Sequence, residues 1–204
     1  MTFTVWLSLF TISILGAMSP GPSLAMVTKH SLAGGRRNGI STAWAHASGI
    51  ALYAFITLIG LAVLLHQSPV LFKTISYAGA LYLAYLGFNG LRSKGGVAEK
   101  LHSGKAVSLT QSMREGFLIS MLNPKIALFF IALFSQFVAV GDAFSSKAII
   151  VLTPFMVDGL WYTFIAFVIS SSAMLERLRS HAVFIDRLSG VVLILLAIRV
   201  VTMV

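Results

Sequence analysis

The sequence contains no cysteine and few charged residues. Without cysteine, the chain cannot form disulfides, thiolate metal sites or a cysteine nucleophile. Asp, Glu, Lys and Arg make up only 10% of the 204 residues, whereas in soluble domains they make up about a quarter. Hydrophobic residues account for 57%, and the mean hydropathy is +0.91. The chain therefore has too little charge to cover a soluble globule, and its composition indicates a membrane protein.

Six apolar runs occupy most of the chain. Each approaches or exceeds the roughly 20 residues that an α-helix needs to cross about 30 Å of hydrocarbon. Barrel strands would instead show about ten residues of alternating polarity. We therefore predict an all-α polytopic membrane protein, a single domain over residues 1–204, with six transmembrane helices. These helices are expected at about 4–27, 40–65, 69–91, 116–140, 146–173 and 182–203.

The basic residues predict the orientation in the membrane. The net charge is +9, but no soluble basic face is present to bind nucleic acid. Most Lys and Arg residues lie between the first and second, third and fourth, and fifth and sixth runs. By the positive-inside rule these segments face the cytoplasm, so both termini are expected on the outer face. The N-terminus has no basic leader and no convincing cleavage site, so we expect no removable signal peptide.

The two halves of the chain carry prolines at matching places. Aligning SPGPSLAM (19–26) with NPKIALFF (123–130) sets Pro20 opposite Pro124. The alignment predicts one repeat at about 1–91, a cytoplasmic linker at about 92–115 and a second repeat at about 116–204. Because each repeat has three spans, the second is inverted, and such transporters bind solutes near the midplane at interrupted helices.

Residues at the two interruptions are therefore candidates for binding a substrate. Structural kinks and local helix capping are the alternative roles for these positions. The candidates are Ser19, Pro20, Gly21, Pro22, Asn123 and Pro124.

Three ionisable residues inside the runs add candidate chemistry. Asp158 is the only carboxylate well inside a predicted span, and a buried carboxyl that can gain and lose a proton suits proton coupling. Lys125 follows Pro124 and is a counter-charge for Asp158 or a partner for an anionic substrate group, unless it snorkels to an interface. His46 is either a proton relay or a packing residue.

Missing motifs and dispersed histidines exclude some classes of function. The sequence has no HExxH or GxSxG motif, so we expect no enzyme. The remaining histidines are dispersed, so we expect neither a metal site nor a cofactor. Small residues recur every four positions at Ala43, Ala47 and Ala51, which is compatible with a tight bundle and with a homodimer.

Four motifs resemble one transporter family along nearly the whole chain. They are SPGP (19–22), GRRNG (35–39), GALYLAYLGFNGLR (79–92) and SMLNPKIALFF (120–130). Together they resemble the lysine exporter superfamily, in particular its homoserine and threonine efflux branch. The resemblance implies a six-span exporter of the bacterial inner membrane that moves amino acids, mainly neutral ones such as threonine, homoserine or leucine, by proton antiport. It lends no support to His46 as a site residue.

Two alternatives to amino acid export stay open at this point. One is an exporter of another small solute, such as a metal ion or a metabolite. The other is a non-transporting membrane assembly factor, which would need no buried ionisable site.

Overall fold

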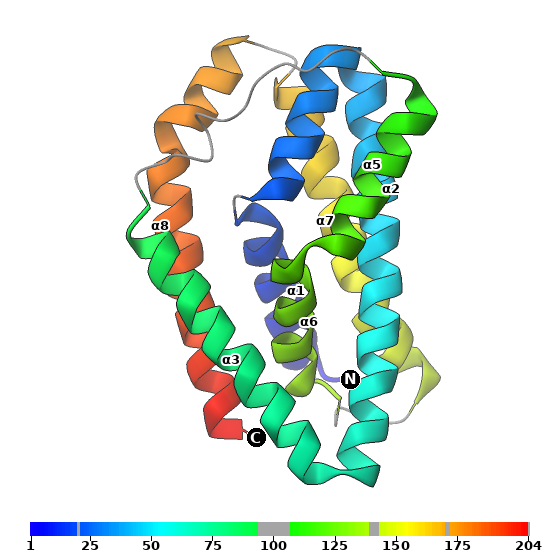
Figure 1. The fold of residues 1–204 in the computed structure, drawn as a ribbon, viewed down its shortest axis with the longest axis vertical. Helices are drawn as coiled ribbons and strands as arrows, with labels where there is room; N and C mark the ends of the chain where they lie inside the picture. Colours follow the sequence, from blue (N-terminus) through cyan, green and yellow to red (C-terminus); the bar gives the residue numbers. More distant parts are fainter. Residues whose placement is uncertain (20, 94–106, 139–142, 170–171, 204) are drawn as a thin grey trace.

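All the regular secondary structure in the described part of the chain is α-helix. The computed structural model describes residues 1–19, 21–93, 107–138, 143–169 and 172–203. These residues form seven helices and no strand, so the predicted all-α class is confirmed (Figure 1). The helices are α1 (Phe3–Met18), α2 (Pro22–Gln67), α3 (Pro69–Leu91), α5 (Leu109–Leu122), α6 (Pro124–Ser135), α7 (Phe144–Ile169) and α8 (Ser172–Met203). Most of the linker predicted at 92–115 lies outside the described residues.

α2 reverses its direction at Gly35. This residue has a φ of 78°, in the left-handed region that favours glycine, and it interrupts the helix. In a straight helix, residues 23 and 46 would be about 35 Å apart at 1.5 Å per residue. Instead, Oγ of Ser23 lies 2.9 Å from Nε2 of His46. Residues 22–34 and 36–67 are thus two antiparallel segments, which Figure 1 shows in blue and cyan.

Two helix breaks lie near mid-height of the bundle, and each is followed by a helix that starts with proline (Figure 1). α1 ends at Met18 and α2 begins at Pro22, while α5 ends at Leu122 and α6 begins at Pro124 with a bend of 56°. Proline suits the first helical turn because an N–H there would lack an intrahelical partner. Pro22 therefore occupies the helical position that Pro124 occupies, and Pro20 lies outside the described residues.

The bundle has an apolar surface and a partly polar interior. Large hydrophobic side chains such as Val70, Leu81 and Leu122 are more than 70% exposed. The main core cluster joins all the described helices except α5 through buried Leu, Ile, Phe, Ala and Val residues. Serines, threonines, two histidines and two aspartates are also buried. An apolar surface around buried polar groups is the arrangement expected of a protein surrounded by lipid.

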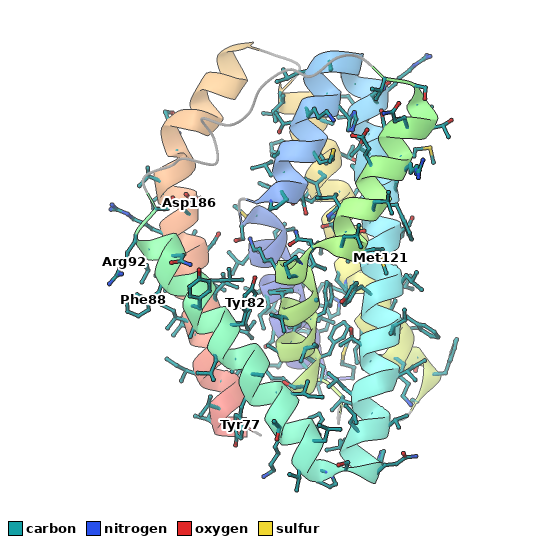
Figure 2. All side chains as sticks on the ribbon, in the orientation of Figure 1. Tyr77, Tyr82, Phe88, Arg92, Met121 and Asp186 are labelled. Atoms are coloured by element: carbon teal, nitrogen blue, oxygen red, sulfur yellow. The ribbon has the colours of Figure 1, made fainter. Side chains whose placement is uncertain are left out.

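α3 and α8 cross at glycines. A Cβ atom added to Gly190 would lie 2.6 Å from the carbonyl oxygen of Gly87, and one added to Gly90 would lie 2.8 Å from the carbonyl oxygen of Asp186. Glycine allows two backbones to approach this closely. The crossing holds Asp186 beside the C-terminal end of α3. Figure 2 labels Asp186 and also Arg92, the residue that follows α3.

Three of the described helices are long and apolar enough to cross a membrane. They are α2, α3 and α7, and the bent pair of α5 and α6 makes a fourth candidate when it is taken as one span. α1 is apolar but shorter. The count of six crossings and the inverted repeat stay predictions. The reversal at Gly35 bears on the count, because it divides α2 into two antiparallel segments.

Candidate functional site

A cavity lies where the two helix breaks meet α7. The space between atoms there, together with the adjoining open solvent, is about 600 Å³. Six of the nine predicted site residues line it, together with apolar side chains from α2, α6 and α8. The six are Ser19, Gly21, His46, Asn123, Lys125 and Asp158.

The deepest polar feature of this cavity is a histidine–aspartate pair. Nδ1 of His46 lies 2.7 Å from Oδ2 of Asp158, and the two residues are only 1% and 6% exposed. An ionised carboxylate can only accept hydrogen bonds, so Nδ1 donates when Asp158 is charged. Both roles weighed for His46, proton relay and packing residue, stay predictions.

Two further side chains hold the imidazole ring of His46. Oγ of Ser23 lies 2.9 Å from Nε2, so both ring nitrogens have a partner. The ring of Tyr162 packs edge-on against the imidazole at a centroid distance of 5.3 Å, and its hydroxyl donates to the carbonyl oxygen of Ala17 at 3.3 Å. The chain Ser23–His46–Asp158 thus connects the start of α2 with the middle of α7 by hydrogen bonds that can carry a proton.

Lys125 joins the two helix breaks. Its Nζ donates to the hydroxyl of Ser19 at 2.6 Å and to the carbonyl oxygen of Ser19 at 3.2 Å. Asn123 caps α6, because its Oδ1 accepts from the backbone N–H of Lys125 at 3.0 Å. Lys125 is predicted to be either a counter-charge for Asp158 or a partner for an anionic substrate group, and this stays a prediction. The ion pair that Asp158 makes within the described residues is with His46. The reason is the fold of α2, which brings His46 to α7.

The predicted prolines occupy different places. Pro124 stands in the first turn of α6. Pro22 stands in the first turn of α2 and lines a second cavity, which also contacts Ser19 and Lys125. Pro20 cannot be placed, since it lies outside the described residues. Both described prolines therefore begin a helix, and of the two only Pro22 lines a cavity.

The sequence did not single out four residues that border the two cavities. Tyr162 lies one turn after Asp158, a spacing that places both on one face of α7 and could have identified it. Ser23 and Ser13 gave no signal, since single serines are common in membrane helices. Asp186 lies within the predicted run 182–203 and is 4% exposed, so a search for carboxylates closer to the ends of the runs would have found it.

Comparison with known proteins places this site in a family. A family model described as LysE type translocator matches residues 14–204, which is nearly the whole chain. The chain belongs to the LysE type translocator family. This confirms the resemblance to the lysine exporter superfamily that the four motifs carry. The family is one of transporters and not of enzymes.

Relatives along most of the chain are membrane proteins. An uncharacterized membrane protein of Haemophilus influenzae is 29% identical over 191 residues, which cover 91% of this chain and 90% of the relative. The leucine efflux protein of an Enterobacter species is 30% identical over 158 residues, covering 78% and 74%. Another uncharacterized membrane protein, from Pseudomonas aeruginosa, is 35% identical over 161 residues, covering 72% and 71%. No solved structure matches the chain.

Proposed function

We propose that the protein is a secondary active exporter of neutral amino acids in the bacterial inner membrane, driven by proton antiport. The observation that carries this proposal is the cavity at the two helix breaks, which combines a buried His46–Asp158 pair with the ammonium group of Lys125. Membership of a translocator family supports transport, and relatives named leucine efflux protein support an amino acid as the substrate.

The proposed topology has six crossings in two inverted repeats. The reversal at Gly35 divides α2 between the first and second spans, so α1 and residues 22–34 form one broken span and α5 and α6 form the other. In Figure 1, α1 lies in the lower half of the bundle and α5 in the upper half, as inversion requires. Both termini lie at the lower end. We assign that end to the outer face. The segments rich in Lys and Arg connect the spans at the opposite end, which the positive-inside rule assigns to the cytoplasm.

The lining of the cavity suits a zwitterion with an apolar side chain. The carboxylate of the substrate binds the ammonium group of Lys125 beside the starts of α2 and α6, where the helix dipoles favour negative charge. The ammonium group binds Asp158. Ile50, Phe129 and Phe130 form an apolar wall that accommodates an aliphatic side chain. A basic side chain would add a positive charge with no acidic partner on that wall.

Proton antiport follows from the competition for Asp158. In the loaded state the carboxylate is ionised and holds the substrate ammonium. A proton that arrives from outside enters the Ser23–His46–Asp158 chain and neutralises the carboxylate, which weakens its hold on the ammonium. The substrate leaves outward, and the proton is released to the cytoplasm before the next substrate binds.

Export from proteoliposomes tests the proposal. Vesicles with purified protein are loaded with labelled leucine, threonine, homoserine or lysine, and efflux is followed with and without an acidic exterior. We expect the acidic exterior to accelerate efflux of at least one neutral amino acid, and Asp158→Asn to abolish the acceleration. Thr74→Val is the control, because Thr74 is exposed on α3 and bonds only to the carbonyl oxygen of Val70 in its own helix.

Two results would contradict the proposal. Full gradient-driven export by Asp158→Asn would remove Asp158 from the coupling step. The absence of efflux of every amino acid by folded wild-type protein would overturn amino acid export, and metal ions and other metabolites would then be the next solutes to screen.

A further inference from the structure

A second cavity adjoins the first one and shares its polar wall. The space between atoms there, together with the adjoining open solvent, is about 610 Å³. Ser19, Gly21, Lys125 and Leu193 line both cavities. The remaining lining of the second cavity comes from Pro22, from the C-terminal end of α3 with Ser93, and from α8, which contributes Asp186. The two cavities therefore share Lys125 and its hydrogen-bond partner Ser19.

Asp186 brings an unsatisfied acceptor into this second cavity. It is 4% exposed, and its Oδ2 accepts from the hydroxyl of Ser93, a residue that also lines the cavity. Its other oxygen, Oδ1, is buried and has no hydrogen-bond partner among the described residues. A buried carboxylate oxygen without a donor is costly, so a site of this kind favours a ligand that donates hydrogen bonds.

The second cavity has opposite charges on its wall. Asp186 and Lys125 both line it. Lys125 donates hydrogen bonds to Ser19, and Oδ1 of Asp186 has no hydrogen-bond partner among the described residues. An anionic oxygen and a cationic nitrogen on one wall complement the two charged groups of a zwitterionic α-amino acid.

We propose that this second cavity is a loading subsite for the exported amino acid, in which Oδ1 of Asp186 accepts hydrogen bonds from the substrate ammonium and Lys125 faces the substrate carboxylate. The inference rests on the proposed function for the identity of the ligand. In the proposed orientation, the C-terminal end of α3 leads to the basic, cytoplasmic segment. A substrate would thus occupy this subsite before it reaches Asp158, and Lys125 would contact its carboxylate in both places.

The absence of cysteine makes a direct test feasible. Ser189→Cys places one thiol in the second cavity alone, and Ser13→Cys places one in the first cavity alone. Each variant, reconstituted in nanodiscs, is treated with thiol reagents of similar size that carry either a trimethylammonium or a sulfonate group. Intact-mass spectrometry gives the labelling rates. We expect the cationic reagent to label Ser189→Cys at least about tenfold faster, because a cavity of one sign concentrates the opposite charge.

Adding Asp186→Asn to Ser189→Cys should abolish this preference, while Asp186→Glu should retain it and also shows that the site tolerates substitution. Leucine should protect Ser189→Cys from labelling, and the hydroxy acid that lacks its ammonium group should not. A preference unchanged by Asp186→Asn would overturn the subsite. Equal protection by sodium ions alone would overturn the ammonium assignment in favour of an inorganic cation.

Transport measured on the same variants separates this inference from the proposed function. If leucine protects Ser189→Cys through Asp186 but the wild-type protein exports no amino acid, the subsite stands and the export proposal fails. If export is normal and Asp186→Asn changes neither protection nor the half-saturating concentration of substrate, the export proposal stands and the subsite fails.

Discussion

His46 and Asp158 are separated by 112 positions in the chain, and Nδ1 of the first lies 2.7 Å from Oδ2 of the second. Both side chains are buried at the junction of α2 and α7. Two facts make this contact possible: Gly35 turns α2 back on itself, and the small side chains of Ala43 and Ala47 are fully buried on the same segment. The pair is therefore a product of the tertiary fold.

Replacing His46 with glutamine should separate binding from coupling. Glutamine keeps a hydrogen-bond donor near Asp158 but cannot take up a proton. We expect His46→Gln to lose most of the acceleration of leucine efflux by an acidic exterior, while exchange of labelled for unlabelled leucine without a gradient continues. The matched control is His66→Gln, since His66 is exposed near the end of α2. Gradient-driven export at the wild-type rate in His46→Gln would show that the pair is structural.

Lys125 should set the affinity for the substrate carboxylate. A hydrogen bond to a charged group contributes about 1.5–3 kcal/mol, which corresponds to about a 10–100-fold change in a binding constant. Lys125→Met keeps the length of the side chain and removes its charge. We expect it to raise the half-saturating substrate concentration by that factor in a flux assay, with Thr74→Val as control. An unchanged half-saturating concentration would mean that Lys125 only fastens the two breaks to each other.

A charged cluster away from the cavity should contribute stability and not specificity. Oε2 of Glu115 on α5 lies 2.9 Å from Nζ of Lys29 and 3.0 Å from Nε2 of His30, both on α2. His30 is 1% exposed, so Glu115→Ala leaves a buried ring nitrogen without this partner, at a cost of about 1–3 kcal/mol. We expect a lower midpoint of thermal unfolding in detergent and an unchanged half-saturating substrate concentration.

Lys29→Ala is the matched control for this cluster. The Lys29 side chain is 38% exposed, and an ion pair of that exposure is worth at most about 1 kcal/mol. Its effect on the unfolding midpoint should therefore be smaller than that of Glu115→Ala. If both variants lower the unfolding midpoint equally, the stability comes from the ion pair between Lys29 and Glu115 and not from the contact between Glu115 and the buried His30.

The sequence was sufficient to predict the helical class and several residues of the cavity, because both depend on the cost of polar groups in lipid. Asp158 and Lys125 stand out in apolar runs for that reason. The partner of Asp158 was not predictable, because it depends on which face of residues 36–67 meets α7 after the reversal at Gly35. Small residues lie on more than one face of that segment, so the pattern alone does not choose a face.

Two further points have local causes. The alignment with NPK sets Pro20 opposite Pro124, and the structure adds that Pro22, also a predicted site residue, begins α2 as Pro124 begins α6. Asp186 precedes Arg187 near the start of an apolar run, where a charge looks like part of the polar flank. Asp186 is buried because α3 and α8 cross closely at glycines. The hydrophobicity of a segment does not predict which helices cross.

The glycine crossing provides the last prediction. A Cβ atom at position 190 would lie 2.6 Å from the carbonyl oxygen of Gly87, a backbone atom that cannot move aside, whereas one at Gly60 would meet nothing within 4 Å. Gly190→Ala should therefore force α3 and α8 apart, at a cost of about 1–3 kcal/mol, and lower the unfolding midpoint. Gly60→Ala, also in a helix interior, should leave the midpoint unchanged or raise it, since alanine favours helix. Because Gly190 and Asp186 both line the second cavity, Gly190→Ala should also weaken protection of Ser189→Cys by leucine. Equal midpoints for the two glycine variants would show that the close approach of α3 and α8 is not required for stability.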